Sequence, residues 1–112
     1  MELRVTILAA AMALFTATPS FAAQVGLIKI NGAIGPATAG YIARALDTAA
    51  AQSDECLIIQ LDTPGGLLDS AEQIVQEIYD AKVPVVVYVA PAPARAGSAG
   101  VFITLAADIA AM

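Results

Sequence analysis

Short apolar runs alternate with amphipathic stretches along residues 25–112. Three runs are rich in β-branched side chains and are bounded by turn-forming residues, so they predict strands: "VGLIKI" (25–30), "CLIIQL" (56–61) and "VPVVVYV" (83–89). The nearly continuous apolar character of the third run is typical of a strand that is covered on both faces. The closing "ADIAAM" (107–112) predicts the start of a fourth strand.

The segments between these runs repeat apolar residues at helical spacing. Pro36 suits the first position of a helix over residues 36–52, whose apolar face comprises Tyr41, Ile42, Ala45, Leu46 and Ala49. A second helix follows residue 66, with the apolar stripe Ala71, Ile74, Val75, Ile78 and Tyr79. Asp69 and Glu72 resemble a capping box at its start. A third helix is predicted from about Ser98 to Ala107.

The alternation of strand and helix predicts an α/β fold with a mainly parallel sheet and right-handed crossovers. In such sheets ligands bind beyond the carboxyl ends of the strands. Two unusual loops, "DTPGG" (62–66) and "APAPARAGSAG" (90–100), follow the second and third strands. Both loops are therefore expected at the same edge of the sheet, where a site would lie.

The N-terminal stretch has the pattern of a secretory signal peptide. Arg4 precedes an apolar run that is followed by Pro19 and small residues, and Ser20 and Ala22 suit a cleavage after residue 22. Residues 1–22 are therefore predicted to be a signal peptide, with an uncleaved signal anchor as the alternative. Residues 23–112 form the predicted domain, which is expected to act outside the cytoplasm.

Charge and composition exclude several classes of protein. The net charge of −5, with only five basic residues, argues against a nucleic-acid partner. The absence of histidine removes the usual metal-site patterns and any Ser–His–Asp triad from this chain, so no metal and no cofactor are predicted. Cys56 is the single cysteine and is interpreted as a small buried apolar residue.

The two loops carry residues suited to acyl transfer. Ser98 lies among small residues at the predicted start of the third helix, where unpaired N–H groups favour developing negative charge. The backbone N–H groups of Gly65, Gly66 and Ala99 are candidate donors to an oxyanion. The alternative is that Ser98 only caps the helix, which is a common role of serine.

The segments "LDTPGG", "SAEQIVQEIYDAKVPVVVYVAP" and "ARAGSAGVFITLAADIAAM" together resemble the NfeD family of membrane-associated serine proteases with a ClpP/crotonase fold. The resemblance implies that Ser98 is the nucleophile, that Gly65, Gly66 and Ala99 form the oxyanion hole, and that substrate lies extended beside the segment starting at Leu67. Pro93 and Gly97 depart from the pattern expected for the family, which has glycine and alanine at these positions.

In the family the general base is a lysine, expected beyond the position of Met112, so residues 23–112 are interpreted as the N-terminal part of a longer protease domain. Lys82 is expected at the opposite edge from Ser98, and Lys29 is expected to face solvent. Asp62 is predicted to hold the loop in place, and Arg95 to point to solvent or to neutralise an acidic neighbour.

Three functions follow from these observations. The favoured one is a serine endopeptidase module that cleaves apolar, membrane-proximal segments of a partner such as a stomatin-like protein. The resemblance also implies a homo-oligomer and membrane association through segments outside this chain. The alternatives are a catalytically inert binding or scaffold module and a crotonase-like acyl-CoA enzyme, and an export signal argues against the latter because acyl-CoA is a cytoplasmic substrate.

Overall fold

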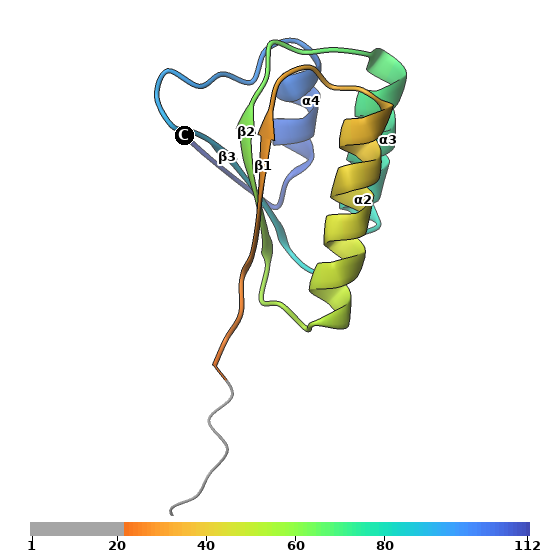
Figure 1. Cartoon of the computed structure of the whole chain (residues 1–112), viewed down its shortest axis with the longest axis vertical. Helices are drawn as coiled ribbons and strands as arrows, with labels where there is room; N and C mark the ends of the chain where they lie inside the picture. Colours follow the sequence, from red (N-terminus) through yellow and green to blue (C-terminus); the bar gives the residue numbers. More distant parts are fainter. Residues whose placement is uncertain (1–21) are drawn as a thin grey trace, which may run out of the picture.

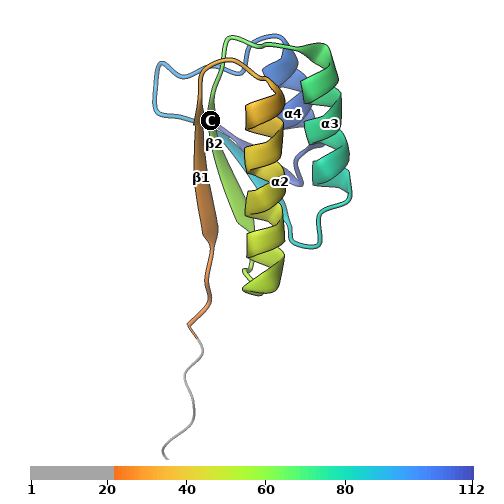
Figure 2. The same cartoon turned by 45° about the vertical axis from the view of Figure 1, so that its right-hand side comes forward.

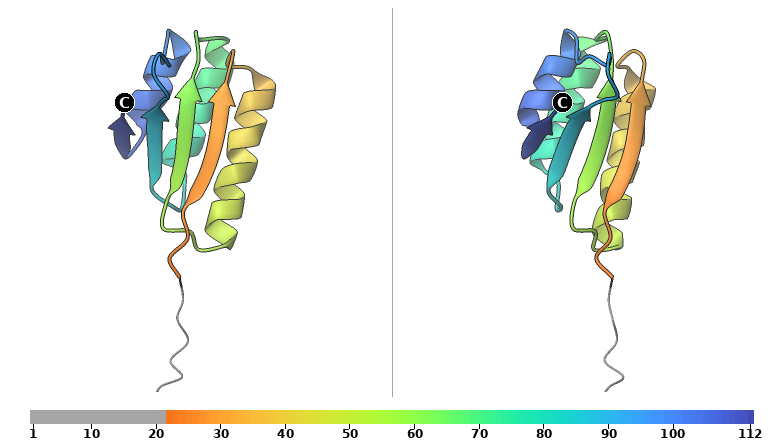
Figure 3. Two further views of the ribbon diagram at one scale, coloured as in Figure 1. Left: turned by 60° about the vertical axis from the view of Figure 1, so that its left-hand side comes forward. Right: turned by 90° about the vertical axis from the view of Figure 1, so that its left-hand side faces the viewer.

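Within residues 22–112, which the computed structural model describes, the strands form one parallel sheet in the order β1-β2-β3-β4. The strands are β1 (Gly26–Asn31), β2 (Leu57–Asp62), β3 (Val85–Val89) and β4 (Ile109–Ala111). Figure 3 shows them side by side, with their carboxyl ends pointing the same way. The parallel α/β architecture predicted from the sequence is confirmed, including the fourth strand.

Three helices connect successive strands and cover one face of this sheet (Figure 1). They are α2 (Pro36–Ala51), α3 (Leu68–Tyr79) and α4 (Ala99–Ala106). Helices α2 and α3 lie next to each other (Figure 2), and α4 packs against α3 on the side away from α2 (Figure 3). The predicted signal peptide falls, except for its final residue, on residues 1–21, which lie outside the described part of the chain.

The hydrophobic core lies between the sheet and the three helices. The strands contribute every second side chain to it, as the two-residue repeat of a strand requires. Ile59 and Val87 are fully buried, and Ile74 and Ile103 cover them from the helices. Full burial of such a side chain contributes roughly 1.5–3 kcal/mol relative to leaving it in water. This packing fixes the strands in register and so places the loops at their carboxyl ends.

The opposite face of the sheet is open within residues 22–112. Val86 is half-buried and Tyr88 is 42% exposed, so the prediction that the third strand is covered on both faces is wrong for this part of the chain. The prediction failed because a continuous apolar run does not show whether both faces of the strand are covered or one face is exposed. On this face an apolar row crosses the sheet in register, formed by Leu27, Ile58, Val86 and Ile109.

Some predicted details of the helices are also wrong. Tyr41 and Tyr79 are 41% and 67% exposed, because they lie at the margin of the apolar stripe rather than at its centre. The predicted capping box does not form: Leu67 occupies the N-cap position of α3 without a side-chain hydrogen bond, and Asp69 lies in the first turn. Cys56, expected to be buried, is half-buried and has a free thiol.

Candidate active site

The two loops predicted to share one edge of the sheet are joined by backbone hydrogen bonds. Thr63 N–H donates to the Arg95 carbonyl at 2.8 Å, and Gly97 N–H donates to the Thr63 carbonyl at 2.9 Å. These bonds form a short parallel bridge between Thr63 and Ala96. The Asp62 carboxylate accepts a hydrogen bond from Arg95 N–H at 3.1 Å, which confirms that Asp62 holds the loop in place. The two loops are thus one connected structure beyond β2 and β3.

Ser98 lies at the N-terminus of α4 in a conformation that an ordinary capping serine does not adopt. Its backbone has φ 48° and ψ −112°, whereas a capping residue usually has an extended backbone. Its hydroxyl makes no capping hydrogen bond to the helix, and the residue is exposed. Positive φ is strained for a residue with a Cβ atom, and such strain is concentrated at functional sites.

Glycines allow the Pro-Gly-Gly turn to approach Ser98 closely. A Cβ atom placed on Gly65 would lie 2.6 Å from Ser98 Cβ and 3.2 Å from Ser98 Oγ, and Gly65 has φ +121°. A Cβ atom on Gly97 would lie 2.8 Å from the Pro64 carbonyl oxygen. Any larger residue at Gly65 or Gly97 would therefore push the turn away from the serine.

The three candidate oxyanion donors differ in their availability. Gly65 is buried and its N–H already donates to Thr63 Oγ1 at 3.1 Å. Gly66 is exposed, and its N–H makes no hydrogen bond to any residue of the described range 22–112. The Ala99 N–H, in the first turn of α4, also has no partner in that range. The geometry therefore favours Gly66 and Ala99 over Gly65 as donors.

Leu67 borders the turn but offers no free backbone group. Its N–H donates to the Ile34 carbonyl at 2.9 Å, and its carbonyl accepts from Ala71 N–H at 3.1 Å. Its side chain is 59% exposed, and that of the adjacent Leu68 is 60% exposed. The Leu67 side chain can therefore make apolar contact with a ligand at this edge. Backbone hydrogen bonds to an extended ligand must come from other residues.

Neither lysine of the described residues belongs to the two loops. Lys29 lies in the middle of β1 on the open face, paired in register with Gln60, and it is exposed as predicted. Lys82 follows α3 and precedes β3, at the end of the sheet opposite to Ser98. Arg95 is exposed, and only its backbone contributes to the loop bridge.

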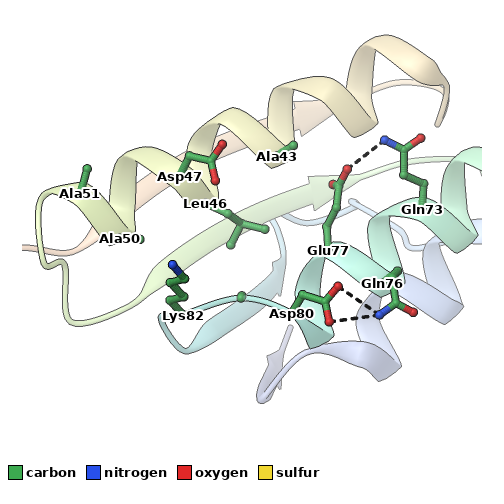
Figure 4. Close-up of a pocket in the computed structure, with 11 residues that line it drawn as sticks. Ala43, Leu46, Asp47, Ala50, Ala51, Gln73, Gln76, Glu77, Asp80 and Lys82 are labelled. Atoms are coloured by element: carbon green, nitrogen blue, oxygen red, sulfur yellow. Dashed lines mark hydrogen bonds between the residues drawn. The ribbon is translucent and has the colours of Figure 1, made fainter.

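A hollow lined by residues of α2 and α3 lies away from Ser98. It is a groove of about 730 Å³ between the C-terminal halves of α2 and α3 (Figure 4). Burial raises the pKa of Glu77 above its ordinary value; the hydrogen bond from Gln73 opposes this rise and the nearby Asp47 charge adds to it. The groove faces the end of the sheet opposite to the serine, so it is not part of the candidate active site.

The part of the chain that the structure describes contains no cluster of three or more His, Cys, Asp or Glu side chains that would suit a metal ion. In that same range no helix combines the length and the apolar character needed to cross a bilayer. Sequence reasoning missed two residues that build the site, Thr63 and Ile34. The position of Thr63 directly before Pro-Gly-Gly was the available signal, whereas nothing in the sequence links Ile34 to the turn.

The parallel sheet, with an exposed serine at a helix N-terminus beside a Pro-Gly-Gly turn, has the arrangement of a ClpP-like protease domain. A solved structure of ClpP1 from Listeria monocytogenes, 28% identical in sequence, matches 72% of this chain and 46% of its own with a TM-score of 0.58. The predicted fold class is thereby confirmed.

The chain belongs to the NfeD1b family, because residues 24–112 match the family model of the NfeD1b N-terminal domain. This confirms the resemblance to the NfeD family. A curated relative, the membrane-bound protease PH1510 of Pyrococcus horikoshii, is 39% identical over 100 residues, which are 88% of this chain. The chain spans about a quarter of that relative's length (23%).

Among the solved structures, a similar one is the 1510-N membrane-bound stomatin-specific protease, a lysine-to-alanine mutant in complex with a substrate peptide. It is 40% identical and matches 80% of this chain and 41% of its own, with a TM-score of 0.79. The relatives are thus proteases with a ClpP-like fold and are named as membrane-bound, which supports a protease module associated with a membrane.

Proposed function

We propose that this chain carries the nucleophile and the oxyanion hole of a serine endopeptidase. The observation that supports this most strongly is the state of Ser98: its backbone has positive φ, its hydroxyl makes no capping bond, and it lies against Gly65. A serine that served only as a helix cap would have an unstrained backbone and a hydroxyl bonded to the helix.

In the proposed reaction, Ser98 Oγ attacks the scissile carbonyl carbon while its proton passes to a general base. The carbonyl oxygen becomes an oxyanion that accepts hydrogen bonds from the N–H groups of Gly66 and Ala99, and the amino terminus of α4 adds a favourable dipole. The tetrahedral intermediate collapses to an acyl-enzyme as the amine leaves with a proton. Water then releases the acyl group by the same route in reverse.

The proposed general base is a lysine outside residues 1–112. Lys29 and Lys82 lie outside the two loops, and the chain has no histidine. A desolvated lysine has a lowered pKa and can accept the serine proton near neutral pH. The relative whose lysine-to-alanine mutant was solved with a substrate peptide supports a lysine at this step.

The proposed substrate is an apolar, membrane-proximal segment of a partner such as a stomatin-like protein. The exposed side chains of Leu67 and Leu68 supply apolar surface at the end of the Pro-Gly-Gly turn, and the substrate is expected to lie extended beside them. The relative named as stomatin-specific supports this class of partner. Exposed apolar residues on α4, Phe102 and Leu105, support the proposed homo-oligomer, which sedimentation of the purified protein would test.

The protein is proposed to be exported, with its active site outside the cytoplasm and membrane anchoring by segments outside this chain. The support is the sequence pattern of residues 1–22, with small residues at Ser20 and Ala22. Amino-terminal sequencing of the protein from its host is expected to give a start at Ala23. A chain that retains Met1 in the membrane would show a signal anchor instead.

A fluorophosphonate probe tests the proposed nucleophile directly in the full-length protein. The activated Ser98 hydroxyl is expected to form a covalent adduct that mass spectrometry assigns to this residue alone. Ser53 is the matched control, because it is also exposed and has positive φ (54°), but it lies in the turn between α2 and β2. Labelling of both serines at equal rates would show that Ser98 is not activated.

A further inference from the structure

Thr63 is a buried polar residue at the centre of the two-loop structure. It is 0% exposed, and among residues 22–112 its hydroxyl has one partner residue, Gly65. Thr63 Oγ1 accepts a hydrogen bond from Gly65 N–H at 3.1 Å and donates one to the Gly65 carbonyl at 3.2 Å. A buried hydroxyl is costly unless it is paired, so this side chain holds Gly65 in one orientation.

The same carbonyl of Gly65 has a second partner on a distant segment. Ile34 N–H donates to it at 2.8 Å, so the oxygen is held from two sides. A trans peptide group is planar, and its N–H points opposite to its C=O. Anchoring the Gly65 carbonyl therefore also sets the direction of the Gly66 N–H, which is the donor that remains free.

Thr63 also contacts the start of α4, where the other free donor lies. A Cβ atom on Gly100 would lie 2.6 Å from Thr63 Cγ2, so the methyl group packs directly against the first turn of this helix. The backbone of Thr63 bonds to Arg95 and Gly97, just before Ser98. One side chain and its backbone thus connect the Gly66 donor, the serine loop and the helix that carries the Ala99 donor.

We infer that Thr63 is a positioning residue of the oxyanion hole: its hydroxyl fixes the Gly65–Gly66 peptide so that the Gly66 N–H faces the oxyanion formed at Ser98. Thr63 does not touch the substrate, and it acts through Gly65. This inference rests on the proposed function and goes beyond it, because it assigns the orientation of a donor to a side chain outside the reacting groups.

The test compares Thr63→Val and Thr63→Ser in the full-length protein with a peptide substrate. Valine keeps the shape of threonine and removes the hydroxyl. We expect kcat to fall about 10- to 100-fold with KM within about twofold, since loss of a whole oxyanion donor lowers kcat by about 10²–10³-fold. Serine restores the hydroxyl, and its kcat is expected within about threefold of the parent.

A second readout separates positioning from a general structural role. A peptide boronic acid forms a tetrahedral adduct with the serine and uses the oxyanion hole, whereas the ground-state substrate does not depend on it. Thr63→Val is expected to weaken boronic acid binding by the same factor as kcat/KM. If Thr63→Val does not fold, Thr63→Cys paired with Thr63→Ser replaces it, because both lack the methyl group and only serine keeps the hydroxyl.

The inference is overturned if Thr63→Val cleaves at the parental rate. It is also overturned if Thr63→Ser, which keeps the hydroxyl, loses as much activity as the variant without a hydroxyl (Thr63→Val or Thr63→Cys). It is also overturned if KM rises while boronic acid binding is unchanged. Ser98→Ala, assayed alongside, keeps the two proposals apart. Cleavage of the peptide by Ser98→Ala would contradict the proposed function itself. If Ser98→Ala is inactive and Thr63→Val is fully active, only the proposed role of Thr63 is contradicted.

Discussion

Ser98→Ala is expected to abolish peptide cleavage by the full-length protein, with kcat lowered by about 10⁴-fold or more, because the attacking oxygen is lost. The fold should be unaffected. The hydroxyl makes no capping bond that could be lost, and serine and alanine are similarly strained at φ 48°. The melting temperature is therefore expected within about 1 °C of the parent, since only changes near 1 kcal/mol shift it by several degrees.

The matched control for this variant is Ser53→Ala. Ser53 is exposed and has φ 54°, so the substitution makes the same chemical change in a similar backbone conformation. Ser53→Ala should cleave at the parental rate. A folded Ser98→Ala protein that still cuts peptide would contradict the proposed mechanism and would leave Ser98 as a residue that only begins α4.

Gly66→Ala is expected to lower kcat by about 10²–10³-fold, the loss typical of one oxyanion donor. A Cβ atom at this position would overlap the backbone of Ile34, including its carbonyl oxygen, and the residue has φ +157°. Relief of this overlap must shift the turn away from Ile34, and so displaces the Gly66 N–H from its present orientation. Steady-state kinetics on the full-length variant measure the effect.

Gly35→Ala is the control for the glycine variant. Gly35 follows Ile34 directly, has an extended backbone with φ −155°, and has open space around an added Cβ atom. Its activity should equal that of the parent, which would show that the loss in Gly66→Ala comes from the turn and not from any change near Ile34. Equal activities of Gly66→Ala and the parent would exclude Gly66 as a donor.

The sequence was sufficient for the order of elements and for the edge that holds the two loops. The β-branched runs and the helical spacing of residues such as Ile42 and Ile74 follow from backbone periodicity, which local sequence encodes. It also pointed to Ser98 as a candidate nucleophile, because a serine surrounded by glycine and alanine can be recognised from the sequence itself. These predictions depend on residues close together in the sequence and on the parallel topology that the alternation of strands and helices implies.

Several details of the site depend on backbone geometry and on particular contacts, which residue type alone does not specify. Gly65 and Gly66 look equivalent in "TPGG", yet only the structure shows that Thr63 occupies one N–H and leaves the other free. The positive φ of Ser98 is likewise seen only in the structure. The exposure of Tyr88 was missed because residue type does not report which face of a sheet is covered.

The hydrogen bonds between the two loops determine which part of the second loop can change in length without moving Ser98. The Arg95 backbone is held by the Asp62 carboxylate and by Thr63, three residues before Ser98. Residues 90–94 lie between the end of β3 and this anchor, and Pro91 to Pro93 are exposed. Insertions or deletions in that segment change the span of an outer loop without shifting the register of Ser98 relative to Gly66. The edge that carries Ser98 is thereby separated from the exposed outer part of the loop.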